Sequence, residues 1–476
     1  MVEQYVPADA SRPIARLMRP VKYFFHLKVA GGILLFLNSL LAMFWANSRW
    51  HESYHDLWHA PFSIKLGDFA LSYPVEYWIN DGLMVIFFFV IGLEIKREIL
   101  VGELRSVKKA LLPIVAALGG VVVPASIYLA INKGGPGEPG WGIPMATDIA
   151  FALGMLAILG RKAPPSLTIF LTALAIADDL AAVLVIAIFY TAQLSISSLM
   201  IGFGLLGLMV IANMLWVRSP IVYALLGFGV WLAFLKSGVH ATIAGVLAAF
   251  CIPARMLVEP DVFLSAGRRL LDRFERLTKA MPSLPEARMV KWGGRIGIFQ
   301  NQHQIETIES LEKVCEYSQT PLQRMERGLH LWVTILILPL FALANAGVEV
   351  IGDPREMLLT PVTMGVVLGL VLGKPVGIFL FSWVAVKLGW CLLPVGARWK
   401  HILAVGCLAG IGFTMSLFIT GLAFSDRALT NEAKLGILAG SLVAVVLGGA
   451  ALQLAGGKEP QTAEPEESEE EPDYQK

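Results

Sequence analysis

The chain has 476 residues, of which 56% are hydrophobic and only 16% are charged. Soluble domains carry roughly a quarter charged residues, so this composition excludes an ordinary soluble protein and indicates a chain solvated largely by lipid. The formal net charge of +1 gives no indication of a nucleic-acid partner, and the four cysteines lack the C-x-x-C spacing typical of zinc sites.

Apolar runs long enough to cross a hydrocarbon core of roughly 30 Å recur along the chain. Twelve such segments are predicted, at 29–46, 78–93, 111–132, 142–160, 167–190, 197–217, 219–236, 238–253, 331–350, 361–386, 402–424 and 435–454. The first is longer than a signal-peptide core and lacks a small-x-small cleavage pattern, so it is expected to stay as a helix. The sequence therefore predicts an all-α polytopic membrane protein, with eight segments within 29–253 and four within 331–455.

Orientation follows from the excess of Lys and Arg on the cytoplasmic side of a membrane protein. If residues 1–28 lie inside, the short inner stretches hold 16 basic residues and the outer stretches hold 7. We therefore expect both termini in the cytoplasm and the protein in a bacterial inner membrane.

Between the first two segments, residues 62–77 include an alternating stretch, SIKLGDFALSY, around Gly67-Asp68. Such alternation predicts a small outer β-hairpin, although a disordered loop is the alternative. An isolated hairpin is marginal in water. It would need a partner surface, and a second subunit is one candidate.

Two polar stretches are expected on the cytoplasmic side. Residues 254–330 form a basic loop, whose stretch LSAGRRLLDRFERL has apolar residues at helical spacing with arginines between them. This segment is predicted either to lie on the anionic inner leaflet or to be a solvated regulatory loop. Residues 456–476 are rich in acidic residues and proline and are expected to be disordered.

Two adjacent acids, Asp178 and Asp179, fall at the midpoint of the fifth segment. An ionisable side chain at the bilayer centre costs at least roughly 2.5 kcal/mol, so such residues indicate function. Neighbouring helix positions point about 100° apart, so the two acids should face different surroundings and have different roles. A structural pair neutralised by protonation is the alternative.

The tenth segment carries Lys374 near its middle, within GKPVG. A buried ammonium needs a negative partner to stay charged, and Asp178 and Asp179 are the natural candidates. A lysine that snorkels to the membrane surface is the alternative.

Two segments are predicted to be interrupted helices. The fourth contains Pro144, Thr147 and Asp148, and the eleventh contains Gly410 and Gly412. Small residues placed for close helix packing are the alternative. Seven crossings separate the two segments and reverse their direction, so they are predicted to correspond in an inverted repeat, which points to a binding site in secondary transporters.

These groups suit exchange of a cation for protons. Sodium prefers oxygen ligands, which the carboxylates, Thr147 and unwound carbonyls would supply. A carboxylate also binds protons, and a carrier that changes sides only when loaded must exchange one for the other. The sequence therefore predicts a sodium/proton antiporter without a cofactor, in which Asp178 and Asp179 bind Na⁺.

Other classes fit less well. The chain has no G-x-x-x-x-G-K-[ST] loop, so no nucleotide partner is expected. An intramembrane enzyme with paired aspartates is one alternative, but Leu180 and two alanines follow the pair, without a second metal-binding acid. A cation channel is the other, but interrupted repeats favour alternating access over a fixed pore.

At these residues the sequence resembles the NhaA-type sodium/proton antiporter family. The resemblance covers almost all of residues 20–255 and 325–455. Seven blocks carry it: NDGLMVIFFFVIGLEIKRE (80–98), ATDIAFALG (146–154), AIADDLAAVLVIAIFYT (175–191), SGVHATIAGV (237–246), LPLFALANAG (338–347), LGKPVGI (372–378) and GIGFTMSLFI (410–419).

The resemblance implies twelve helices with the interrupted fourth and eleventh crossing, and a homodimer supported by the outer hairpin. It also implies electrogenic exchange of more protons than sodium ions, with lithium accepted. Asp179 would be the principal ion ligand, Asp178 the second titrating acid paired with Lys374, and Thr147 and Asp148 elements of the broken helix.

The family's pH-response cluster would map onto Glu94, Arg97, Glu98, Glu326 and His330, with His240 as a weaker contributor. An ordinary charged helix end is the alternative for the first three, and a packing histidine for His240. The family typically has E-H-x-L-H-P where this chain has ERGLHL at 326–331, so one titratable group is missing. That departure and the long 254–330 loop affect the expected pH profile, not the expected transport.

Overall fold

The computed structural model describes residues 30–67, 69–160, 163–191, 194–279, 302–349 and 354–455. Within these ranges the chain is helical apart from one two-stranded sheet. The N-terminal segment 1–28, the centre of the 254–330 loop and the acidic tail 456–476 lie outside or partly outside the described residues, so the predictions for them have no structural counterpart.

The elements follow one another as a nearly unbroken series of helices, with η marking 3₁₀ and π segments. In chain order they are α2 (Ala30–Ala46), α3 (His51–His59), β1 (Pro61–Leu66), β2 (Phe69–Pro74), α4 (Val75–Tyr77), η2 (Trp78–Leu83), α5 (Met84–Val101), η3 (Glu103–Arg105), α6 (Val107–Asn132), η4 (Glu138–Met145), α7 (Ile149–Leu159), α8 (Pro165–Phe189), α9 (Ile196–Met214), α10 (Pro220–Leu235), α11 (Ala241–Cys251), α12 (Pro260–Lys279), α13 (Gln302–Ser318), α14 (Pro321–Trp332), η6 (Val333–Ile337), α15 (Leu338–Asn345), α16 (Pro354–Leu358), α17 (Pro361–Leu368), η7 (Gly369–Gly373), α18 (Lys374–Lys387), α19 (Trp399–Ala409), α20 (Phe413–Ala423) and α21 (Arg427–Ala455).

Many of these helices are apolar enough to span a bilayer. Among the described residues seven qualify by length and composition, or nine if each of two bent pairs counts as one span, and α10 and α11 are shorter apolar helices. The protein is therefore an all-α polytopic membrane protein. The count of twelve spans stays a prediction. It includes the segments that correspond to α10 and α11, and α11 has only 11 residues, fewer than a helix needs to cross the bilayer.

The structure places the start of the ninth apolar helix before the predicted segment 331–350. The ninth apolar helix begins ten residues earlier, because Thr320 caps α14 through a capping box with Gln323 and the span runs over Pro321–Asn345. The charged residues of this first turn lower its hydropathy, which is why the sequence pattern assigned it to the loop. The remaining loop is not simply extended, since it contains α12 and α13.

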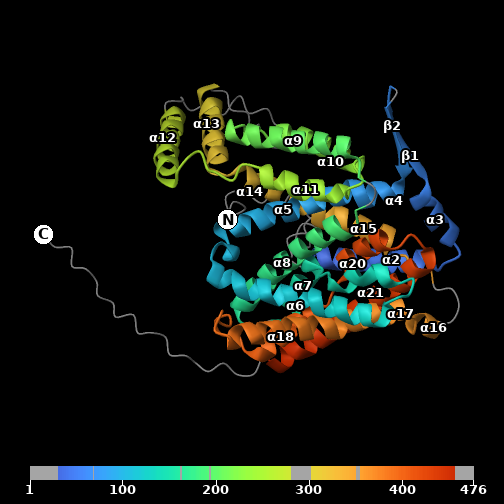
Figure 1. Ribbon diagram of the computed structural model, residues 1–476. Coiled ribbons are helices and arrows are strands. Elements are labelled where there is room, and N and C mark those ends of the chain that lie inside the picture. Colours follow the sequence, from blue (N-terminus) through green and yellow to red (C-terminus); the bar gives the residue numbers. More distant parts are fainter. Residues whose placement is uncertain are drawn as a thin grey trace, which may run out of the picture.

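Most helices run in one common direction, with α9, α10 and α11 along one side and α6, α17 and α18 along the other (Figure 1). The α6 and α18 helices approach backbone to backbone at Gly119 and Gly377, where an added Cβ would collide with the other helix. Small residues permit such close approach in membrane helices. This contact holds the start of α18 against α6.

The two strands of the outer hairpin pair antiparallel, from Pro61 opposite Pro74 to Leu66 opposite Phe69. Gly67 adopts a φ of +60° in the turn. The hairpin projects away from the helices (Figure 1) and contacts them through the Trp78 indole, which donates to the carbonyl oxygen of Phe62 at 3.1 Å.

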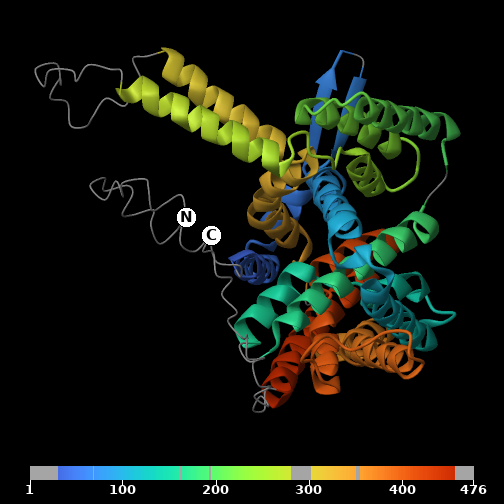
Figure 2. The same cartoon turned by 90° about the vertical axis from the view of Figure 1, so that its left-hand side faces the viewer.

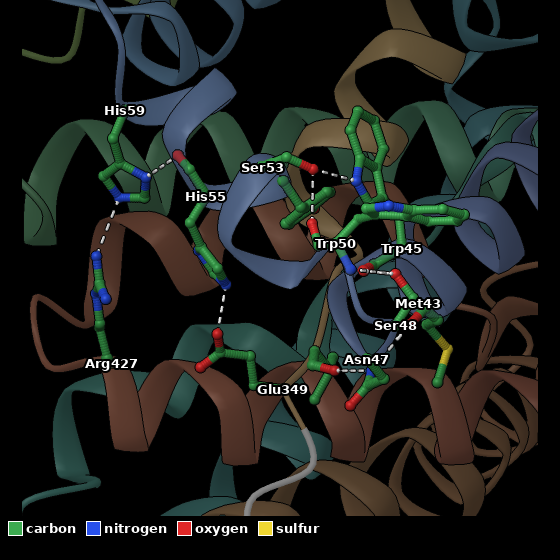
Figure 3. A network of polar contacts seen from close by, with 12 residues as sticks. Met43, Trp45, Asn47, Ser48, Trp50, Ser53, His55, His59, Glu349 and Arg427 are labelled. Atoms are coloured by element: carbon green, nitrogen blue, oxygen red, sulfur yellow. Dashed lines mark hydrogen bonds and ion pairs between the residues drawn. The ribbon is translucent and has the colours of Figure 1, made fainter.

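On the same side of the molecule, a polar network holds α3 against later segments (Figure 3). The Asn47 amide donates to Val348 O at 2.7 Å, and His55 Nε2 lies 2.5 Å from a carboxylate oxygen of Glu349. Figure 3 also shows His59 beside Arg427, the first residue of α21. The network thus joins α3, which turns back from α2 by 113°, to the end of α15 and the start of α21.

Candidate ion site at the helix breaks

Both predicted interruptions are present in the structure. Helix η4 ends at Met145 and α7 begins at Ile149, while α19 and α20 are bent by 47° around residues 410–412. Pro144 lies inside η4 and removes a backbone donor just before the first break. Gly410 and Gly412 occupy the second break, where a Cβ on Gly410 would collide with the carbonyl oxygen of Leu370.

The two breaks contact each other directly. The backbone N–H of Asp148 donates to Ile411 O at 2.7 Å, and the Thr147 hydroxyl donates to Ala409 O at 2.8 Å. The Ser416 hydroxyl donates to Ile143 O at 2.7 Å. Backbone groups freed by one break are therefore satisfied by the other, which is how irregular backbone is tolerated at membrane depth. That the two whole helices cross stays a prediction.

Asp148 lies between the N-terminal ends of two half-helices. It caps α7 by accepting from Phe151 N–H at 2.9 Å, and its other oxygen accepts from the Thr414 hydroxyl at 2.6 Å and the Thr414 N–H at 3.2 Å. Helix N-termini carry partial positive charge, so one buried carboxylate compensates both ends.

Asp178 and Lys374 form a buried ion pair in the described structure. Lys374 is fully buried, and its ammonium also donates to the Thr147 hydroxyl at 2.7 Å. The pair joins α8 to α18, and the threonine adds the break before α7. The predicted partnership of Lys374 with an aspartate is therefore present, and snorkelling to the surface is excluded for this lysine.

The backbone around Lys374 is adapted to this position. Residues Gly369–Gly373 form a π-helical turn immediately before it, and Pro375 follows it. Because proline has no N–H to give to the preceding turn, a widened turn accommodates the missing bond. The irregularity occurs where α18 must place its first side chain among the helix breaks.

Asp179 has different surroundings from Asp178. Its side chain is 2% exposed, yet no hydrogen bond or ion pair joins its carboxylate to another residue in the described ranges. It interacts electrostatically with the acids Asp178, Glu94 and Asp148, and also with the ammonium of Lys374. The adjacent acids thus differ as expected: Asp178 is in an ion pair with Lys374, and Asp179 forms no ion pair within the described ranges.

No group of three or more His, Cys, Asp or Glu side chains in the described ranges is arranged to hold a metal ion. A cation at Asp179 would therefore need hydroxyl, carbonyl or water oxygens as further ligands, which suits a hard monovalent ion better than zinc.

Five of the six proposed pH-response residues gather at one place. Arg97 on α5 forms an ion pair with Glu326 on α14, and its guanidinium lies 3.1 Å from Glu98 and 3.8 Å from Glu94. His330, one turn after Glu326, interacts with it electrostatically. These residues form one charged cluster between α5 and α14.

His240 does not belong to that cluster. It precedes α11, and its ring lies 3.7 Å from the carboxylate of Asp81. Asp81 is 13 residues before Glu94 on η2 and α5, which is about 20 Å along a helix. The contact of His240 with Asp81 could not be predicted from the sequence, because it depends on how the helices that carry these two residues pack against each other.

Sequence reasoning also overlooked Asp81 and the role of Thr414. Asp81 is an acid within a predicted span. The cost of placing a charge in the membrane could therefore have marked it as a candidate functional residue from the sequence. Nothing local marks Thr414 as the partner of Asp148, which lies 266 positions away.

Comparison with known proteins agrees with this architecture. The family profile described as Na⁺/H⁺ antiporter 1 matches residues 22–452. The chain is 49% identical to a Na⁺/H⁺ antiporter NhaA of Oleidesulfovibrio alaskensis over 96% of this chain and 99% of that protein. It is 48% identical to one of Koribacter versatilis over 94% and 93% of the two chains, and 47% identical to one of Acidithiobacillus ferrooxidans over 91% and 96%. The seven resemblance blocks thus lie within a match that runs from before α2 almost to the end of α21, and the chain belongs to the Na⁺/H⁺ antiporter 1 family.

Proposed function

We propose that the protein carries out electrogenic exchange of Na⁺ or Li⁺ for protons, with Asp179 as the group that binds either the cation or a proton. The observation that carries this proposal is the buried Asp179 carboxylate, which lies beside the paired Asp178 and forms no ion pair of its own with any residue that the structure describes. A buried charge without a partner is costly, so this carboxylate favours a bound cation or proton.

Asp178 is proposed as the second titrating acid. Its pair with Lys374 favours the charged carboxylate, and protonation of Asp178 or deprotonation of Lys374 would break that pair. A second proton-binding group would allow more than one proton to be exchanged for each cation. The net charge moved per cycle would then make transport respond to membrane potential.

The helix breaks are proposed to form the site that alternating access exposes to each side of the membrane in turn. Asp148 and Thr147 join the two breaks through hydrogen bonds with Thr414 and Ala409. Transporters of this type expose a midplane site to one side and then to the other by moving one group of helices against another. The two broken stretches are proposed to stay in place while other helices move around the site.

The charged cluster between α5 and α14 is proposed to adjust activity with pH. Glu94 belongs to it and also interacts electrostatically with Asp179, so the cluster and the ion site share one residue. Titration there would change the field at the site. His240, which lies elsewhere, is proposed only as a separate contributor through Asp81.

The protein is proposed to lie in the bacterial inner membrane, with both termini in the cytoplasm. The support is the distribution of basic residues between the connecting segments. The hairpin would then face outward, and the α5–α14 cluster and the α12–α13 pair would face inward.

A homodimer through the hairpin is also proposed. An apolar cleft of about 1250 Å³ runs between the hairpin, η2, α10, α11 and α14, with Phe62, Ile64, Trp78, Phe228 and Trp231 among its lining. An apolar cleft of this volume, continuous with the projecting hairpin, fits a second copy. Ile64→Glu should convert dimers to monomers by mass measurement in detergent, and unchanged dimers would contradict this assignment.

The direct test of function is transport by purified protein in sealed vesicles with a pH-sensitive dye inside. Addition of Na⁺ or Li⁺ outside should drive proton efflux, and K⁺ should not. Movement of charge through a channel would dissipate a sodium gradient without coupled proton movement. Counterflow of labelled Na⁺ against unlabelled Na⁺ separates the two, because only a carrier accumulates label.

A further inference from the structure

Lys96 on α5 points away from the charged cluster formed by its neighbours. Its ammonium donates to the carbonyl oxygens of Phe250 at 2.7 Å and Ile252 at 2.5 Å. Both carbonyls belong to the C-terminal end of α11. Lys96 therefore joins α5 to the end of a different helix from the one that Arg97 contacts.

The end of α11 requires such partners. The last four carbonyls of a helix have no intrahelical donor, and the C-terminus carries partial negative charge. Asn213 of α9 donates to Cys251 O at 2.9 Å, and Leu322 N–H of α14 donates to Pro253 O at 3.1 Å. Lys96 alone among these donors supplies a positive charge.

Along their length, α5 and α11 are held by close backbone packing. A Cβ on Gly92 would lie 2.7 Å from the Cβ of Ala249, and a Cβ on Gly245 would collide with the carbonyl oxygen of Val85. The helices therefore fit together without intervening side chains at two points. Lys96 fixes the same pair at its end.

The opposite side of α5 faces the ion site. Glu94 interacts electrostatically with Asp179, and positions two apart on a helix point about 200° apart. Lys96 thus donates hydrogen bonds to the end of α11 on one side of α5, while Glu94 faces Asp179 on the other side. Glu94 is on α5 and Asp179 is on α8, so a movement of α5 that follows its release from α11 would change the separation of these two carboxylates.

We propose that Lys96 is a positioning residue for the exchange reaction: by holding the end of α11, it sets the distance between Glu94 and Asp179 and so the pH at which exchange is half-maximal. The inference rests on the proposed function. The titratable and charged groups around this tether are Glu94, Arg97 and Glu98 on α5, Cys251 on α11, and Glu326 and His330 on α14.

The first test compares pH profiles of exchange in vesicles. Lys96→Met, which removes the donors, should displace the half-maximal pH by about half a unit or more, and Lys96→Arg should restore the parent profile. Asn213→Leu is the matched control, since it removes a bond to the same helix end from α9 and not from α5. It should lower the melting temperature without displacing the profile.

A second test separates position from charge. In a Glu94→Gln background the separation of Glu94 from Asp179 no longer affects proton binding, so adding Lys96→Met should cause no further displacement. A direct field of the Lys96 ammonium on Asp179 would persist in that background, and a persistent displacement would overturn the proposal. A Lys96→Met profile that coincides with the parent would overturn it as well.

If Lys96→Met is not recovered from membranes, Gly92→Ala tests the same helix pair one turn earlier on α5, where Gly92 contacts Ala249. The added methyl group should push α5 from α11 and displace the profile, and an unchanged profile would count against the proposal. Failure of the proposed function is distinguishable, because the parent protein itself would then show no Na⁺-driven proton movement.

Discussion

Two regions of the molecule use the same kinds of charged residues in opposite ways. At the helix breaks Asp148, Asp178 and Lys374 are all at most 3% exposed and bond to residues on other elements. In α12 no side chain is buried, and a representative ion pair, Lys279 with Glu275, joins residues one turn apart that are 75% and 61% exposed. Figure 2 shows α12 and α13 side by side, extending away from the other helices.

The difference lies in what burial does to a charge. Exposed ion pairs contribute about 0 to 1 kcal/mol, whereas removing one partner of a buried pair costs roughly 3 to 5 kcal/mol. A change at the breaks should therefore alter both folding and transport. A change in α12 should alter neither strongly.

The segment that contains α12 and α13, called the excursion below, begins and ends at neighbouring positions in the structure. Leu257 N–H donates to Tyr317 O at 3.3 Å, Arg218 donates to Gln319 O at 2.8 Å, and Leu322 N–H donates to Pro253 O. A segment whose ends are already adjacent can be shortened without moving its flanks.

The largest effect is expected at Asp179. Asp179→Asn should reduce Na⁺-driven proton movement in vesicles to the level of empty vesicles, because an amide cannot alternate between a proton and a cation. The protein should still insert and elute as a single species, since this side chain makes no bond to another described residue. Normal exchange by this variant would contradict the assignment of the ion ligand.

The pair of Asp178 and Lys374 should show strong coupling. Lys374→Met alone should lower stability by about 3 kcal/mol or more, because it leaves a buried carboxylate without its partner. Adding Asp178→Asn should recover much of that loss in melting experiments in detergent, while transport stays impaired. Additive effects of the two changes would remove the pairing from the account.

A smaller effect is expected at Thr414. Thr414→Val removes the hydroxyl bond to Asp148 but keeps the backbone bond, so we expect a loss of about 1 to 3 kcal/mol and a severalfold lower maximal rate. Thr414→Ser is the matched control and should behave like the parent. If valine and serine have equal effects, the hydroxyl does not serve Asp148.

The smallest effect is expected in the excursion. Deletion of 260–315, closed by a short glycine-serine linker, should leave the exchange rate within about twofold of the parent. The deletion must end before Thr320, the N-cap of α14. As a control, Thr320→Ala in the full chain reports the effect of losing that cap. Complete loss of transport in a well-expressed deletion would show that the excursion belongs to the mechanism.

The sequence was sufficient for the buried charges and the breaks. Asp178, Asp179 and Lys374 stood out because charge within an apolar run is rare, and Pro144, Gly410 and Gly412 because they interrupt helices. Features that depend on distant packing were not accessible, such as the bond between Asp148 and Thr414.

Two features of the structure differ from the sequence pattern for identifiable reasons. The start of α14 was missed because Arg324, Glu326 and Arg327 lower the hydropathy of a turn that the structure nevertheless caps and packs. His240 was expected to be only a weaker contributor to the pH response, and it lies beside Asp81 in η2, away from the charged cluster.

The central claim is that one carboxylate binds either a proton or the cation. The most direct measurement is the apparent KM for Na⁺ as a function of pH in vesicles with purified parent protein. Competition for one group predicts that KM rises about tenfold for each pH unit lowered, or more steeply if Asp178 also releases its proton, with a constant maximal rate. A KM that stays constant while the maximal rate falls would contradict competition at Asp179 and leave the α5–α14 cluster as the origin of the pH response.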